Sequence, residues 1–187
     1  MSHLVLALDS AGTPSKWLPV RDAALYLIQD KIVCGMGETE LVLRGGTNRI
    51  TGAESRIEVP TIICVRGSDF MVRNFDRAPA LTHEKLFMRD RNICCYCAQE
   101  FKPSQLEAEH VHPKSRKGEW SWMNIVSACR RCNNYKADRR PEEAGMEMHY
   151  APYVPSLYED FLMRGRNVLD DQMDFLKKRM PKHSRLL

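Results

Sequence analysis

The sequence predicts an α+β protein in which a short cysteine-rich, basic segment is set among ordinary strands and helices. Its 187 residues are enough for one compact domain, or for a small domain with substantial additions. A hydrophobic content of 43% with 28% charged residues is typical of a globular protein. The two features that stand out are paired cysteines and an uneven distribution of basic residues, both between residues 86 and 145.

The first 80 residues are predicted to form an α+β scaffold region. Residues 3–8 are an apolar run typical of a short buried strand, and turn-forming residues follow at 9–14. Apolar spacing of helical period predicts a helix over residues 20–32. Further strands are expected around 41–43 and 61–65, separated by turns at Gly45-Gly46 and at Gly52. No repeat or catalytic pattern occurs in this region, so its predicted role is structural.

Residues 146–187 are predicted to be a helical extension. Two segments have helical patterns, at about 156–163 and 166–180, and a basic tail follows them. No apolar run approaches the roughly 20 residues that a membrane span requires. The N-terminal residues also lack the features of a signal peptide. These observations predict a cytoplasmic protein without a membrane partner.

Basic residues are concentrated in one part of the chain. Residues 85–140 hold 12 of the 28 Lys and Arg residues but only 6 of the 24 Asp and Glu residues. A local positive charge of this kind favours binding to a phosphate backbone, although a solvated surface gives the same count.

The cysteines predict a metal site rather than a disulfide framework. Five of the seven lie in two clusters, at 94–97 and 129–132, each containing a C-x-x-C pair. Such a pair presents two thiolates at the separation that tetrahedral zinc requires, so Cys94, Cys97, Cys129 and Cys132 are the predicted ligands. Because four protein ligands close the site, the zinc would be structural.

Three other residues near the two pairs, Cys95, His110 and His112, are alternative zinc ligands. Cys95 lies inside the first pair, where its side chain should point away from the metal, and His110 and His112 belong to a different pattern. Cys34 and Cys64 are isolated in apolar surroundings and are expected to be buried hydrophobic side chains.

The 31 residues between the pairs, together with those around them, carry a second motif. Its elements, in chain order, are Glu109-His110, Pro113-Lys114-Ser115-Arg116, Trp122-Met123-Asn124 and Cys129-Arg130-Arg131-Cys132-Asn133-Asn134-Tyr135-Lys136. This arrangement resembles the HNH endonuclease family, in its zinc-knuckled members with a ββα-metal (His-Me finger) core. The resemblance is dense over about residues 88–145, and the predicted module spans 86–145.

The resemblance implies roles for individual residues. His110 would be the general base that activates water, since an imidazole can accept a proton near neutral pH. Glu109 and Asn133 would hold one catalytic Mg²⁺ or Mn²⁺ ion. Asn124 would brace the loop that carries His110. The zinc knuckle would fix Asn133, which directly follows Cys132.

Six basic residues are candidate contacts for the phosphate backbone of duplex DNA. They are Lys114, Arg116, Arg130, Arg131, Lys136 and Arg139. Trp120 and Trp122 are expected to pack in the small core, and His112 is expected to be a loop residue near the site.

The sequence departs from the family pattern at two positions. The usual Asp before the histidine is Glu109, and the usual Gly-Gly turn is Lys117-Gly118. Both leave open a non-catalytic zinc-knuckle module that binds nucleic acid. RNA or branched DNA as the substrate also remains open, as does a homodimer or a protein partner bound through the N-terminal region.

Overall fold

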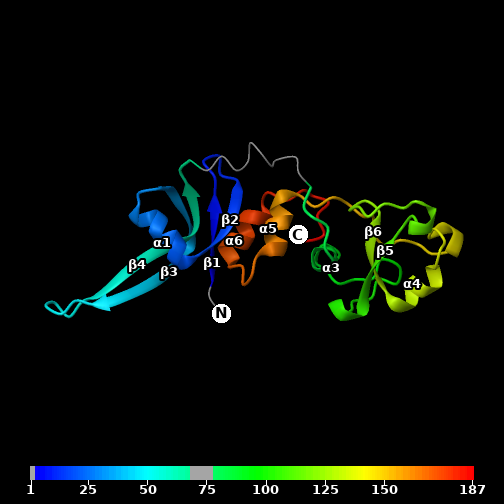
Figure 1. Cartoon of the computed structure of the whole chain (residues 1–187), viewed down its shortest axis with the longest axis horizontal. Coiled ribbons are helices and arrows are strands. Elements are labelled where there is room, and N and C mark those ends of the chain that lie inside the picture. The colour runs from blue at the N-terminus through cyan, green and yellow to red at the C-terminus, as the bar shows by residue number, and fades with distance from the viewer. Residues whose placement is uncertain (1–2, 68–77) are drawn as a thin grey trace. The chain divides into compact units, whose positions relative to one another are not determined.

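The computed structural model describes residues 3–67 and 78–187, which form two compact units. The first contains residues 3–67 and 164–179, and the second contains residues 78–163 and 180–187. Figure 1 gives the elements of both. The α+β class predicted from the sequence is confirmed. No helix in the described part of the chain is long and apolar enough to span a membrane.

The first unit is built on a sheet with the strand order β2-β1-β4-β3. These strands are β1 (Leu4–Leu8), β2 (Pro14–Pro19), β3 (Ile32–Thr47) and β4 (Glu54–Val65). Strand β1 runs antiparallel to β2 and parallel to β4, and β3 and β4 form a long antiparallel hairpin. The strands predicted at 3–8, 41–43 and 61–65 are therefore present. Strand β3 continues through Gly45 and Gly46, so the expected turn there is wrong, and the chain reverses between Asn48 and Ala53.

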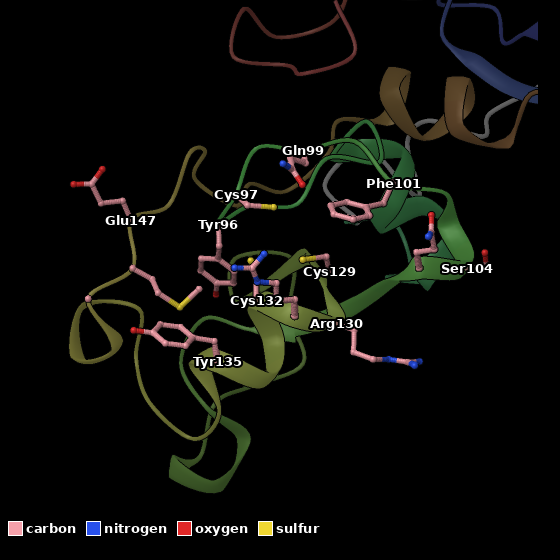
Figure 2. A pocket seen from close by; sticks show the side chains of 14 residues that line it. Tyr96, Cys97, Gln99, Phe101, Ser104, Cys129, Arg130, Cys132, Tyr135 and Glu147 are labelled. Atoms are coloured by element: carbon pink, nitrogen blue, oxygen red, sulfur yellow. The ribbon is translucent and has the colours of Figure 1, made fainter.

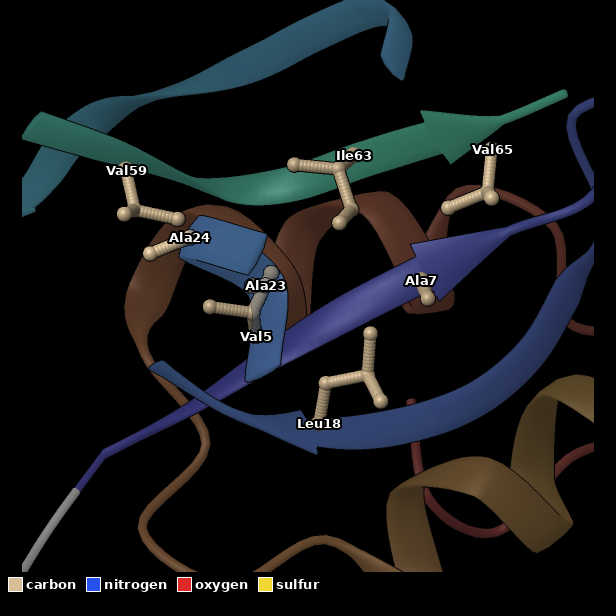
Figure 3. Packing of buried hydrophobic residues seen from close by; sticks show 8 residues of the cluster. All are labelled: Val5, Ala7, Leu18, Ala23, Ala24, Val59, Ile63 and Val65. Atoms are coloured by element: carbon tan, nitrogen blue, oxygen red, sulfur yellow. The ribbon is translucent and has the colours of Figure 1, made fainter. Parts of the chain in front are cut away.

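Within the residues that the structure describes, helices α1 and α6 pack with this sheet. Helix α1 (Val20–Ile28) is shorter than the predicted helix over 20–32, because Asp30 has a positive φ of 53° and β3 begins at Ile32. Its Ala23 and Ala24 pack against Val5, Val59 and other strand residues in an apolar cluster (Figure 3). Helix α6 (Asp170–Lys177) is fastened by Gln172, whose Nε2 donates to the carbonyls of Leu4 and Thr61 at 2.8 Å each.

Cys34 and Cys64 correct the prediction made for them. They lie opposite each other in the β3–β4 register and form a disulfide, with their Cα atoms 5.1 Å apart. Cys64 is buried as expected, whereas Cys34 is exposed. The partners are 30 positions apart, so only the strand register brings them together.

The second unit contains a β-hairpin followed by a short helix. The antiparallel strands are β5 (Leu106–His110) and β6 (Ile125–Cys129), and helix α4 (Arg130–Lys136) follows β6 directly. Three short 3-10 helices occur in its loops, η1 (Pro103–Gln105), η2 (Lys114–Arg116) and η3 (Glu142–Ala144). This ββα arrangement is the core that the sequence predicted for residues 86–145.

Helix α3 (His83–Arg89) packs against β5 and β6, and an ion pair between Lys85 and Asp160 joins it to helix α5 (Leu157–Arg164). Arg89 and Asp90 are both fully buried and form an ion pair with Nε and Oδ1 2.8 Å apart. Arg89 also donates to the carbonyls of Trp122, Ile125 and Tyr153, and Asp90 accepts from the backbone and hydroxyl of Ser127. The pair thus fastens α3 to β6, and the sequence analysis missed it.

The predicted helical extension over 146–187 is divided in this structure. Helix α5 packs within the second unit, whereas α6 packs within the first. The proposed three-part division of the chain, at 1–80, 86–145 and 146–187, remains a prediction about which segments fold independently.

Candidate nuclease site and metal centre

The four predicted zinc ligands come together. The Sγ atoms of Cys94, Cys97, Cys129 and Cys132 all lie within 4.8 Å of one another. Cys94 and Cys97 belong to a turn after α3, closed by hydrogen bonds from Cys94 N to Gln99 O and from Ala98 N to Cys94 O. Cys129 ends β6, and Cys132 lies in the first turn of α4. Four thiols gathered this closely fit zinc by both donor chemistry and spacing.

The alternative zinc ligands, Cys95, His110 and His112, lie outside this cluster. Among the described residues, the group of side chains able to hold a metal consists of these four cysteines and includes neither Cys95 nor a histidine. The Cys95 thiol is buried and donates to Tyr150 O at 3.3 Å, and its burial raises its pKa to about 12. Cys95 is therefore a packing residue, as predicted. Backbone hydrogen bonds, by contrast, hold the pKa of the Cys94 thiol below its ordinary value in spite of burial.

A groove of about 880 Å³ runs beside the cysteine cluster (Figure 2). Cys97, Cys129 and Cys132 line it together with Tyr96 and Tyr135. Exposed Arg130 and Arg131 also contribute to its lining. The groove is part of the surface around the metal centre.

Strand β5 carries the candidate catalytic residues. His110 is its last residue, half-buried, with its ring centroid 5.7 Å from that of Trp120. Burial lowers the pKa of His110 below its ordinary value, and Lys114 and Lys136 act in the same direction, whereas Glu109 opposes them. A neutral imidazole can accept a proton, so His110 has the protonation state that a general base needs.

Glu109 lies one residue earlier and points toward helix α4. Its Oε1 atom lies 2.5 Å from Nζ of Lys136, whose side chain is fully buried. An ammonium group with no exposed surface needs such a partner, because an unpaired buried charge is strongly destabilising. Lys136 therefore fixes the Glu109 carboxylate, while the second carboxylate oxygen is not part of this ion pair.

Asn133 projects from α4 toward the same face of β5. Its Nδ2 atom donates to Oε2 of Glu107 at 2.7 Å, and Nε of Arg130 donates to Oε1 of the same carboxylate at 3.2 Å. The hydrogen bond from Asn133 is the main reason that the pKa of Glu107 lies below its ordinary value. The sequence analysis missed Glu107, although its spacing of two from Glu109 in a strand was a usable signal.

The loop after His110 is held by Asn124. The Asn124 side chain accepts from His112 N at 2.8 Å and donates to Glu119 O at 2.8 Å, and its backbone carbonyl accepts from Val111 N. His112 lies in this loop, with Nε2 3.2 Å from a guanidinium nitrogen of Arg140. The contacts of Asn124 are thus with the loop backbone.

The Lys117-Gly118 pair explains how this loop tolerates its departure from Gly-Gly. Lys117 adopts the left-handed conformation, with φ 68° and ψ 25°, in which glycine is usual. At Gly118 a side chain is excluded, because a Cβ atom there would lie 1.8 Å from the carbonyl oxygen of His112. The second glycine is therefore the one that the loop geometry requires.

Four of the six predicted phosphate contacts are exposed at the surface, and the other two are not. Lys114, Arg130 and Arg131 are exposed, and the Arg130 side chain remains 78% exposed while paired with Glu107. Arg116 is exposed but pairs with Glu143.

The prediction for Lys136 is wrong, because its side chain is fully buried on Glu109. Arg139 donates from Nε to the carbonyl of Lys136 and also donates to the carbonyl of Tyr135, so it caps the end of α4.

The two tryptophans differ. Trp122 is buried, as expected, and its Nε1 donates to Pro79 O at 2.7 Å. Trp120 is 48% exposed and lies between the rings of His83 and His110, so the prediction that it packs in the core is wrong.

The second unit thus has a ββα module with a cluster of four cysteines that could hold a metal ion. Residues 94–149 match the family model for the HNH endonucleases. The chain therefore contains an HNH domain, and an HNH domain implies a nucleic-acid substrate. No curated protein matches the chain.

Proposed function

We propose that the HNH domain is a metal-dependent endonuclease that hydrolyses phosphodiester bonds of DNA, with duplex DNA as the main substrate. The observation that carries this proposal is that His110 and Glu109 end β5, and that α4, which carries Asn133, is joined to the same strand by the Glu109–Lys136 and Glu107–Asn133 contacts. A protein that only bound zinc and nucleic acid would not need His110, Glu109 and Asn133 in that arrangement.

The oxygen donors suit a hard divalent cation. Glu109 offers a carboxylate and Asn133 an amide carbonyl, on two elements that are joined by the Glu109–Lys136 and Glu107–Asn133 contacts. Magnesium and manganese prefer such oxygen ligands and retain several waters. When bound, the ion would offset the negative charge that develops on the phosphate.

His110 would accept the proton of the attacking water, and its lowered pKa keeps it ready to do so at neutral pH. Asn124 would hold the loop that follows His110 in position, and with it the end of β5. Lys114, Arg116, Arg130 and Arg131 would bind the phosphate backbone, since they are the exposed members of the basic set.

Zinc would have a structural role in this scheme. It would hold the turn at Cys94 and Cys97 against the start of α4, and so fix the helix that carries Asn133. Dimerisation or partner binding through the N-terminal unit remains a further proposal.

A plasmid-nicking assay with Mg²⁺ or Mn²⁺ tests the proposal. The native protein should relax or linearise the plasmid, while His110→Ala should lose at least about 100-fold of the activity, the usual contribution of a general base. His149→Ala is the matched control, because His149 contributes its backbone N–H to Cys95 O, a contact that alanine retains.

Both variants should keep one zinc per chain, measured by elemental analysis. If neither the native protein nor the control cuts DNA while both bind zinc and DNA, the non-catalytic module is the correct reading. Equal cleavage of RNA and duplex DNA in parallel reactions would contradict the preference for DNA.

A further inference from the structure

Glu107 occupies the same face of β5 as Glu109. The two residues are two positions apart in the strand, and side chains with this spacing point to one side. Both face helix α4, where Glu109 meets Lys136 and Glu107 meets Asn133 and Arg130. The family pattern gives no role to Glu107, and its carboxylate is nevertheless held by two side chains of α4.

The contact with Asn133 decides how that amide is oriented. An asparagine side chain ends in an NH₂ donor and a carbonyl acceptor, and the torsion that exchanges them is soft. An ionised carboxylate only accepts hydrogen bonds, so it can bind the NH₂ end alone. In the structure Nδ2 of Asn133 lies 2.7 Å from Oε2 of Glu107. The carbonyl oxygen is therefore at the end of the amide that Glu107 does not bind.

That orientation is the one that a cation ligand requires. A metal ion binds the carbonyl oxygen of an amide and is repelled by its NH₂ group. An asparagine free to rotate would present the wrong end for part of the time. Arg130 strengthens the constraint, because its Nε binds the other oxygen of Glu107 and prevents the carboxylate from turning away.

We infer that Glu107 is a positioning residue for the catalytic cation, which orients the Asn133 carbonyl oxygen toward it without contacting it. The inference rests on the proposed function, since it assigns a role at the same site. It adds Glu107 and Arg130 to the residues that determine cation affinity, and it gives Arg130 a role besides phosphate binding.

The test is the affinity of the zinc-loaded protein for Mn²⁺, measured by titration in the absence of DNA. Glu107→Met keeps the length of the side chain but cannot accept the hydrogen bond, and it should weaken Mn²⁺ binding by about 10–100-fold. Glu107→Gln retains an oxygen acceptor for Asn133 and should stay within about 3-fold of the native protein. Glu84→Ala, which removes an exposed carboxylate of α3, is the control for net charge.

Cleavage gives a second readout. Raising Mn²⁺ to saturation should restore most of the activity of Glu107→Met, because positioning affects occupancy rather than the proton transfer at His110. Zinc content and the unfolding temperature of each variant establish that the module is folded. If Glu107→Met does not fold, the Mn²⁺ affinities of Glu107→Gln and Arg130→Met can still be compared. Arg130→Met is then expected to bind Mn²⁺ more weakly than Glu107→Gln.

Three results would overturn the inference. Native Mn²⁺ affinity in folded Glu107→Met would mean that Asn133 needs no such partner. An equal and large loss in Glu107→Gln and Glu107→Met, as large as in Glu109→Ala, would make Glu107 a direct ligand. Native affinity in both Glu109→Ala and Asn133→Ala would instead show that the proposed cation site itself is wrong.

Discussion

The cysteine cluster and the polar face between β5 and α4 lie in the same small domain but are built differently. In the cluster, four side chains of one type meet around a single point, with their Sγ atoms within 4.8 Å of one another. On the polar face, unlike groups are paired with one another, Glu109 with Lys136 and Glu107 with Asn133. The first arrangement could hold a metal ion, whereas the second is held by its own contacts.

The difference suggests that the cysteine cluster serves the folding of the domain, whereas the face between β5 and α4 serves its proposed chemistry. Metal binding to the cysteines would contribute directly to the stability of the module. The hydrogen-bonded face keeps its geometry through its own contacts, so the proposed catalytic cation would not be needed to hold it together. The following variants probe this distinction, beginning with the largest effect.

Cys132→Ser should unfold the HNH domain. Structural zinc contributes an apparent binding free energy of about 10–16 kcal/mol in small zinc modules, far more than a marginally stable domain can lose. Zinc content and circular dichroism on heating measure the effect. Cys95→Ala is the control, since Cys95 is buried in the turn that carries Cys94 and Cys97 but contacts Tyr150 O, and it should retain its zinc. A folded, zinc-loaded Cys132→Ser would contradict the ligand assignment.

Lys136→Met should destabilise the domain by about 3 kcal/mol, because it leaves the Glu109 carboxylate without its buried partner. Added Mn²⁺ should recover part of this loss, since a cation at Glu109 can replace the ammonium group. Denaturant unfolding with and without Mn²⁺ measures both effects. Loss of zinc from this variant would show that the cysteine cluster depends on the polar face between β5 and α4.

Gly118→Ala should lower the free energy of unfolding by about 1–3 kcal/mol, the usual range for overpacking. Its Cβ would meet the His112 carbonyl, so the loop after His110 must shift, and cleavage should fall more than zinc binding does. Thermal unfolding and single-turnover cleavage on the same preparation measure the two effects. Unchanged stability and cleavage would mean that the loop has another accessible conformation.

Lys117→Gly should have the smallest effect, a rise in the free energy of unfolding of at most about 1 kcal/mol. Glycine relieves the left-handed conformation of Lys117, but it also gives the unfolded chain more freedom. Thermal unfolding measures the difference. A loss above about 1 kcal/mol would mean that the Lys117 side chain contributes a contact of its own.

The features that could be predicted from the sequence are those encoded in short spacings. Two C-x-x-C pairs identified the cysteine cluster, and apolar runs identified β1 and the end of β4. The motif around His110 also identified the ββα order correctly.

The rest depended on contacts between distant residues. The Cys34–Cys64 disulfide depends on the β3–β4 register, and the buried Arg89–Asp90 pair depends on carbonyls of residues 122, 125 and 153. Lys136 looked like a surface cation because charged side chains are usually exposed. Only the packing of α4 against β5 reveals that it is buried on Glu109.

The most direct test of the account is to follow cleavage and bound zinc in one sample during brief EDTA treatment and metal addition. The account predicts that cleavage stops while zinc remains bound, and that Mg²⁺ or Mn²⁺ alone restores it. If cleavage is lost only as zinc leaves, and returns only when zinc is added, the separation between a structural and a catalytic metal is wrong.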